Sequence, residues 1–275
     1  MPRLAPLTDF FRLIVPGWAV AEIGSSRATV QGRFPVDEVA GFAKSVEQSL
    51  AENGVMLALV GRIGRPQEEL PPGVEFTHIG LAVYSKINTA DGRVLPGYAT
   101  YNLYQKTDQL DESELVQDYM LDFFLGAQEL KAGIIIPHKK LQLELIQMIV
   151  DDSWRELHNP RYSVMSNPFN DKYQNCTEFI LNVIHAAIYD TTDMSQIKQA
   201  TRDYYEPYRI KKNPLAVMLG GMFSKEIAVN DHDGAFETST YKSIADYMEK
   251  YKLSENAYTI KTDLLENAFI EHETN

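Results

Sequence analysis

The chain has 275 residues, 44% of them hydrophobic, with a net charge of −12 and a pI of about 5.0. This length and hydrophobic content can supply one sizeable core, so we expect a single compact domain with a helical appendage. The acidic balance, without any cluster of basic and aromatic residues, argues against nucleic acid and anionic membrane surfaces as partners.

The chain contains one cysteine, Cys176, and six histidines. A single thiol excludes an internal disulfide and a thiolate zinc cluster, and the histidines show no HExxH spacing, so we expect no metal site and no cofactor. No apolar run is long enough to predict a membrane span. Residues 10–21 are apolar but contain Arg12 and Pro16, so the sequence leaves open whether they form an export signal.

Hydrophobic periodicity predicts an α+β fold. Residues 1–35 lack a clear period and are interpreted as a leader or irregular arm, which makes residues 36–275 the domain. Apolar residues spaced by three or four predict helices, and unbroken or alternating apolar runs predict strands. The predicted helices are 36–53, 115–124, 137–154, 175–189 and 194–210, and the predicted strands are 55–63, 75–84, 98–105 and 134–136. We expect the residues after about 190 to form a helical extension.

Cys176 lies in the segment Tyr-Gln-Asn-Cys-Thr-Glu-Phe (173–179), where a polar loop gives way to a predicted helix. The partial positive charge of a helix N-terminus lowers the pKa of a thiol and so favours the reactive thiolate. Most free cysteines, however, are small buried core residues, and Cys176 shares the apolar stripe of its helix with Ile180 and Val183. Its position alone therefore leaves open whether it is a nucleophile or a packing residue.

His78 is the imidazole best placed to act as a general base for the thiol. On its predicted strand it shares a face with Gly80 and Ala82, and these small neighbours leave space for a side chain from another element. The other candidates, His138, His158 and His185, are expected to have structural roles. His185 is on the cysteine helix about two and a half turns from the thiol, which is too far to reach it.

A cysteine hydrolase also needs a polar group that orients the imidazole and donors that bind the oxyanion. We expect the strand of His78 to pair with residues 98–105, which nominates Asn102 and, less directly, Tyr104 as the orienting residue. The helix N-terminus offers backbone donors, to which Gln174 or Asn175 could add a side-chain donor. Asparagine is also a good N-cap, and a strand asparagine is as often an ordinary hydrogen-bonding residue.

The segment Thr-His-Ile-Gly (77–80) on a strand, followed by Asn-Cys-Thr-Glu-Phe (175–179) on a helix, resembles circularly permuted NlpC-type papain-like proteins. These include lecithin:retinol acyltransferase-like proteins and small thiol isopeptidases, in which the histidine precedes the cysteine. The resemblance implies a papain-like antiparallel sheet packed against the cysteine-bearing helix, with extra helices. It also implies that Cys176 is the nucleophile, His78 the base and Asn102 the orienting residue.

A succession of short blocks is similar to a bacterial family known as domain of unknown function 2145. The blocks are Ala-Leu-Val-Gly-Arg (58–62), Phe-Thr-His-Ile-Gly (76–80), Tyr-Asn-Leu-Tyr (101–104), Asp-Phe-Phe (122–124), Leu-His-Asn-Pro-Arg-Tyr-Ser (157–163), Tyr-Gln-Asn (173–175) and Asp-His (231–232). Members do not uniformly have cysteine after the Tyr-Gln-Asn block, so the resemblance implies the fold more firmly than the chemistry. Many begin with an export signal, which favours a periplasmic or secreted location over a cytoplasmic one.

These residues support three hypotheses. The first is a cysteine hydrolase or acyltransferase of the peptidase or amidase class, acting on an amide or ester bond of a peptide, lipid or other acyl substrate. The second is a non-catalytic binding module on the same scaffold. The third is a structural or interaction subunit that uses residues 190–275. The sequence determines neither the substrate nor the oligomeric state.

Overall fold

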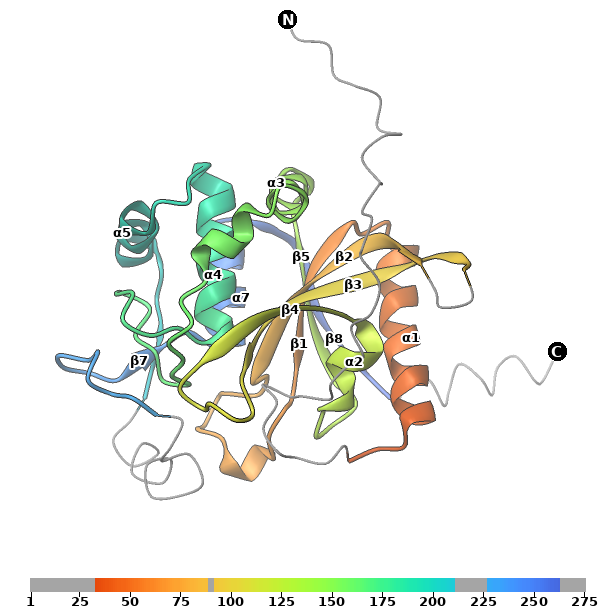
Figure 1. Ribbon diagram of the computed structural model, residues 1–275, viewed down its shortest axis with the longest axis horizontal. Coiled ribbons are helices and arrows are strands. Elements are labelled where there is room, and N and C mark those ends of the chain that lie inside the picture. The colour runs from red at the N-terminus through yellow and green to blue at the C-terminus, as the bar shows by residue number, and fades with distance from the viewer. Residues whose placement is uncertain (1–32, 89–91, 211–226, 263–275) are drawn as a thin grey trace, which may run out of the picture.

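The computed structural model describes residues 33–88, 92–210 and 227–262, and its main element is a six-stranded antiparallel sheet (Figure 1). The strand order is β4-β3-β2-β1-β5-β8. These strands are β1 (Leu57–Arg62), β2 (His78–Asn88), β3 (Val94–Gln105), β4 (Ser113–Tyr119), β5 (Lys131–Pro137) and β8 (Ser254–Lys261), and a small ribbon pairs β6 (Tyr208–Arg209) with β7 (Glu237–Thr238). Residues 10–21, for which the sequence leaves an export signal open, and almost all of the predicted arm lie outside the described residues.

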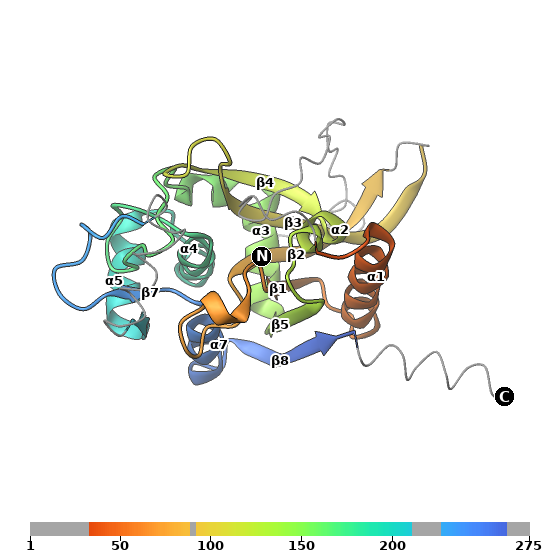
Figure 2. The same ribbon diagram turned by 90° about the horizontal axis from the view of Figure 1, so that it is seen from below.

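Helices cover both faces of this sheet (Figures 1 and 2). On one face lie α1 (Val36–Glu52) and α2 (Met120–Leu125), and on the other lie α3 (Lys139–Val150), α4 (Cys176–Tyr189), α5 (Met194–Tyr204) and α7 (Tyr241–Lys250), with short 3-10 helices at Gln67–Glu69 and Ser153–Leu157. Each face has its own core. Alternate residues of β2 enter different cores, because Ile79 and Leu81 pack on the α4 side whereas Ala82 packs on the α1 side.

The structure confirms the mixed α+β class, the first predicted helix as α1, the cysteine helix as α4 and the hairpin of β2 with β3. The helix predicted over 115–124 is present only in its second half, as α2, and the prediction is wrong for 115–119, which belong to β4. Every residue of β4 after Ser113 is half-buried, so this strand has no alternation from which it could be recognised. The predicted extension is only partly helical, since β8 completes the main sheet beside β5.

Two predicted helices end earlier than expected. The helix predicted to reach residue 154 ends at Val150, and the one predicted to end near Pro207 ends at Tyr204. Within the described ranges, no helix combines the length and the apolar character that crossing a bilayer requires.

Helix α7 docks on the sheet through Tyr241, its first residue. Gly61 on β1 and Gly133 on β5 are register partners, and a Cβ atom added to either would lie within 2.8 Å of the Tyr241 ring. The ring of Phe76 packs beside it, with the two ring centroids 4.7 Å apart. The paired glycines therefore let α7 approach the sheet closely, which places the preceding residues 238–240 beside the N-terminus of α4.

Gly61→Ala should destabilise the protein by about 1–3 kcal/mol, because the Tyr241 ring must move to admit the new methyl group. The matched control is Gly41→Ala on α1, where no atom lies within 4 Å of the added Cβ. That change should stabilise by about 0.5–1 kcal/mol through helix propensity. Chemical denaturation of both variants measures the difference, and equal effects would contradict the close docking of α7.

Candidate active site

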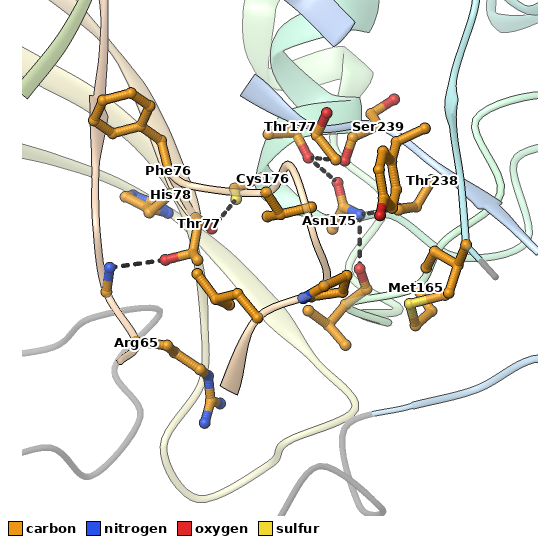
Figure 3. A pocket seen from close by; sticks show the side chains of 18 of the residues that line it. Arg65, Phe76, Thr77, His78, Met165, Asn175, Cys176, Thr177, Thr238 and Ser239 are labelled. Atoms are coloured by element: carbon orange, nitrogen blue, oxygen red, sulfur yellow. Dashed lines mark hydrogen bonds between the residues drawn. The ribbon is translucent and has the colours of Figure 1, made fainter. Parts of the chain in front are cut away.

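A pocket of about 100 Å³ lies at the N-terminus of α4 (Figure 3). Its walls come from the connection between β1 and β2, from residues 162–165, and from residues 238–240. Cys176, His78 and Asn175 line this pocket, and Figure 3 shows Cys176 between the other two. The predicted nucleophile and the predicted base thus line one pocket, although they are far apart in the sequence.

Asn175 caps the start of α4. Its Oδ1 accepts hydrogen bonds from the Glu178 amide and the Thr177 hydroxyl, both at 2.8 Å. Its Nδ2 donates to the Val164 carbonyl at 3.0 Å and to the Thr238 hydroxyl at 3.1 Å. Asn175 therefore ties the helix to two walls of the pocket, and its side-chain donors are already engaged, so in this geometry oxyanion binding would rest on backbone amides.

Gln174 was predicted as another oxyanion donor, but its side chain points to the loop that precedes the helix. Its Oε1 accepts from the Asn159 amide at 2.9 Å, and its Nε2 donates to the Leu157 carbonyl at 3.0 Å. It does not line the pocket with Cys176. Gln174 therefore holds the path of the chain into α4.

The Cys176 sulfur contacts the backbone of β2 on both sides of His78. The sulfur lies 3.8 Å from the Thr77 carbonyl oxygen, and the Ile79 amide also interacts with it. No hydrogen bond joins the sulfur to the His78 ring. The sulfur and the His78 ring lie on opposite faces of β2. Cys176 belongs to the core on the α4 side, whereas the His78 ring packs against Phe123 of α2.

The thiol pKa differs from the sequence-based expectation. Cys176 is only 4% exposed, and burial raises its pKa to about 11. The Ile79 amide, the positive charge of Arg62 and the amides at the start of α4 act in the opposite direction but do not offset burial. The helix N-terminus therefore lowers the thiol pKa as expected, but burial outweighs this effect, and in this geometry Cys176 is a neutral thiol at pH 7.

His78 is held at one ring nitrogen and free at the other. Its Nε2 lies 3.3 Å from Asn102 Oδ1, and the ring stacks on Tyr104 with centroids 4.7 Å apart. Its Nδ1 is buried and has no hydrogen-bond partner. Burial, followed by the charge of Arg62, holds the pKa of His78 well below its ordinary value, and the Asn102 hydrogen bond opposes this shift.

The contact between His78 and Asn102 is possible because β2 and β3 diverge at this point. Strand β2 pairs with β1 from His78 onward, but its pairing with β3 begins only at Leu81. The Asn102 side chain lies over Gly80, where a Cβ atom would collide with its Oδ1. Gly80 therefore leaves room beside His78, as expected, and the side chains of Asn102 and Phe123 occupy this room.

Asp118 on β4 fixes the orientation of Asn102. Asn102 Nδ2 donates to Asp118 Oδ1 at 2.7 Å, so Asn102 Oδ1 faces His78 and requires a hydrogen on Nε2. The hydroxyl of Tyr104 donates to Asp118 Oδ2 at 2.9 Å, and that of Thr100 donates to Oδ1. Burial raises the pKa of Asp118 to about 6 in spite of these hydrogen bonds. This network leaves Nδ1 of neutral His78 without a hydrogen, as a proton acceptor.

Three further residues contribute to the site although no sequence pattern indicates a role for them, namely Arg62, Asp118 and Phe123. Arg62 is the register partner of His78, and Asp118 is the register partner of Thr100 on the face that Asn102 shares. Had β4 been recognised as a strand, alternation would have placed Asp118 beside Asn102. In the part of the chain that the structure describes, no three His, Cys, Asp or Glu side chains converge as metal ligands.

Residues 49–248 match the family described as an uncharacterized protein conserved in bacteria, DUF2145. The chain belongs to this family. The matched range includes β1 to β5 and α4, and so contains the thiol, His78, Asn102 and Asp118. The family resemblance expected from the short sequence blocks is thus confirmed. No curated protein and no solved structure matches the chain.

Alkylation of the folded protein by iodoacetamide should be slow at pH 7 and should accelerate as the pH approaches about 11, because burial disfavours the thiolate. Cys176 is the only cysteine, so labelling followed by mass spectrometry reports on it alone. Unfolding in urea should return its pKa to about 8.5. Since the folded-state pKa is the higher one, the thiol stabilises the fold below the unfolded value, and this contribution is lost as the pH rises through the folded value. An apparent pKa below 8.5 in the folded protein would contradict this account.

The ¹⁵N chemical shifts of His78 should report a neutral ring with its hydrogen on Nε2, and the ring should not titrate near 6.5, because burial and Arg62 oppose protonation. In Asp118→Asn the acceptor for the Asn102 amide is weakened, and the spectrum should show a mixture of tautomers. A wild-type ring with its hydrogen on Nδ1 would contradict the proposed orientation of Asn102.

Proposed function

We propose that the protein is a cysteine hydrolase or acyltransferase of the peptidase or amidase class, with Cys176 as nucleophile and His78 as general base. The observation that carries this proposal is the free Nδ1 of His78. It belongs to a buried ring that Asn102 and Tyr104 hold in place and that lines the same pocket as the thiol. An imidazole fixed at one nitrogen has the other available to take a proton from a nucleophile.

A papain-like scaffold is part of the proposal. An antiparallel sheet packs against the helix that begins with Cys176, and His78 precedes the cysteine in the chain. Asn102 on the neighbouring strand accepts a hydrogen bond from the ring, as the orienting residue of such an enzyme would. These features support a circularly permuted NlpC-type arrangement.

The reaction begins when the Cys176 sulfur attacks the carbonyl carbon of an amide or ester and the thiol proton passes to His78 Nδ1. The resulting oxyanion is stabilised by the Cys176 and Thr177 amides at the start of α4, because the Glu178 amide already donates to Asn175. The bond to the leaving amine or alcohol then breaks, and the leaving group takes the proton from Nδ1. Water, or an acceptor amine or hydroxyl, attacks the thioester, its proton passes through Nδ1, and the sulfur is released as a thiol.

The proton moves during the attack, because thiol and imidazole are both neutral at rest. The sulfur must also leave the Thr77 carbonyl, since it approaches β2 from the face opposite the His78 ring. The catalytic geometry therefore requires a rotation of the Cys176 side chain, or a shift of the strand end at His78–Gly80 where β2 is not paired with β3. Substrate in the pocket would drive this change.

A non-catalytic binding module is the second candidate. The burial of Cys176 and its raised thiol pKa favour this alternative, because both are typical of a cysteine that packs rather than reacts. The pocket would then bind a ligand without turning it over. A separate interaction subunit built from residues 190–275 has less support, since residues 238–240 line the same pocket and β8 belongs to the main sheet.

A panel of peptide amides, lipid esters and activated esters should include substrates that the wild-type protein turns over and that Cys176→Ala does not. His78→Gln should lower kcat by about 10²–10⁴-fold, because no general base remains beside the thiol. His138→Asn is the matched control, as His138 caps α3 away from the pocket and asparagine also caps well. Turnover should leave an acyl adduct on Cys176 that mass spectrometry detects. Ligand binding without turnover, unchanged in Cys176→Ala, would establish the binding module instead.

A further inference from the structure

Arg62, the last residue of β1, is a buried cation at the pocket. Its side chain is 0% exposed, and the residue lines the pocket together with Cys176 and His78. A guanidinium group keeps its charge throughout the physiological pH range. A charge taken out of water needs hydrogen bonds or an opposite charge in its surroundings. The contacts of Arg62 therefore show how much of this compensation the protein itself supplies.

The compensation that Arg62 receives is partial. Its Nη1 donates a hydrogen bond to the Phe123 carbonyl, and the centres of the Phe123 and Tyr104 rings lie 5.1 Å and 5.7 Å from the guanidinium carbon. Among the described residues, no carboxylate forms an ion pair with Arg62. The nearby Asp118 instead accepts hydrogen bonds from Thr100, Asn102 and Tyr104.

The free atoms of Arg62 lie on one edge of its guanidinium group. Nε and Nη2 are buried and have no hydrogen-bond partner. These two nitrogens are neighbours, and their N–H bonds run parallel from that edge. This is the fork that binds both oxygens of one carboxylate. The unpaired edge therefore matches a planar anion. The guanidinium packs against Phe123 and Tyr104, as the His78 ring does, so an anion reaches this edge only with the same movement of the thiol or of the strand end that the reaction requires.

The charge at the pocket is opposite in sign to that of the chain. The protein has a net charge of −12, yet the charged side chains that line the pocket are Arg62 and Arg65 against Glu69. Glu69 is half-buried, whereas Arg62 is fully buried. A local excess of positive charge in an acidic protein favours an anionic ligand over a cationic one.

We propose that Arg62 binds a carboxylate of the substrate, so that the acyl compounds this pocket accepts are those with a carboxylate close to the reacting carbonyl group. The link to the reaction rests on the proposed function, whereas carboxylate binding does not. A volume of about 100 Å³ suits a short carboxylate-bearing group. A carboxylate fits better than a phosphate, because the further charged oxygens of a phosphate would face apolar wall residues such as Phe76 and Met165.

The first test compares two alkylating reagents of similar size, anionic iodoacetate and neutral iodoacetamide. In both reactions the sulfur–carbon bond forms as iodide leaves, and the thiol proton goes to solvent. At pH 9 and constant ionic strength, the ratio of the iodoacetate rate to the iodoacetamide rate should fall at least about tenfold in Arg62→Met. Arg62→Lys keeps the charge but loses the fork, and should give an intermediate ratio. Lys140→Met, which removes an exposed cation from α3, should leave the ratio unchanged.

The second test does not involve the thiol. Sodium propionate should raise the unfolding temperature of the full-length protein, and propionamide at the same concentration should not, with sodium chloride matching the ionic strength. The increase should be absent in Arg62→Met and preserved in Cys176→Ala. Circular dichroism of Arg62→Met establishes that it is folded. We expect it to be folded, since removing a partly compensated buried charge in favour of a side chain of similar length is often tolerated.

Equal rate ratios in the wild type and in Arg62→Met, or equal stabilisation by propionate and propionamide, would overturn the proposal. Stabilisation by inorganic phosphate exceeding that by propionate would also overturn it, in favour of a phosphate site. These outcomes are separate from the failure of the proposed function. A protein without turnover could still show the propionate effect, and an active enzyme could lack it.

Discussion

The carboxylate of Asp118 sets the orientation of the polar groups on the α2 side of the site. It accepts hydrogen bonds from three side chains of β3, namely Thr100, Asn102 and Tyr104, and through Asn102 it determines which nitrogen of His78 has the hydrogen. All of these contacts depend on the register in which Asp118 pairs with Thr100. A slip of one residue would turn Asp118 to the other face of the sheet and leave the ring without a fixed tautomer.

Two opposing effects act on the pKa of the Cys176 thiol, and their magnitudes explain why this pKa is raised. A helix N-terminus contributes about 0.3–1 kcal/mol to an adjacent charge, and more only in favourable geometries. Burial of an ionisable group shifts its pKa by up to about 3–5 units, which corresponds to several times that energy. Because Cys176 is packed against the backbone of β2, burial prevails. A reactive form of this thiol therefore requires a conformation in which it is less buried or is paired with a protonated base.

The sequence predicted the His78–Asn102 contact and missed Asp118, and both results have one cause. Alternation is clear in β2, where one face is apolar and the other contains His78, Gly80 and Ala82, so its pairing with β3 as a hairpin could be predicted. In β4 both faces are half-buried, alternation is lost, and the segment was predicted as a helix that hides Asp118. Arg62 falls within the predicted strand 55–63 without a predicted role, and only the fold shows that its side chain is buried. Strand β8 was missed because it is an edge strand with mostly exposed residues.

The docking of Tyr241 on the glycine pair has a consequence for the order in which the site is completed during synthesis. The groups that would perform chemistry are encoded in residues 62–178, but the wall at residues 238–240 and the strand that covers the β5 edge come from the end of the described chain. A nascent chain that has emerged only as far as α5 exposes the β5 edge and has an open pocket around the thiol. The protein therefore reaches a finished pocket only after translation has passed α7.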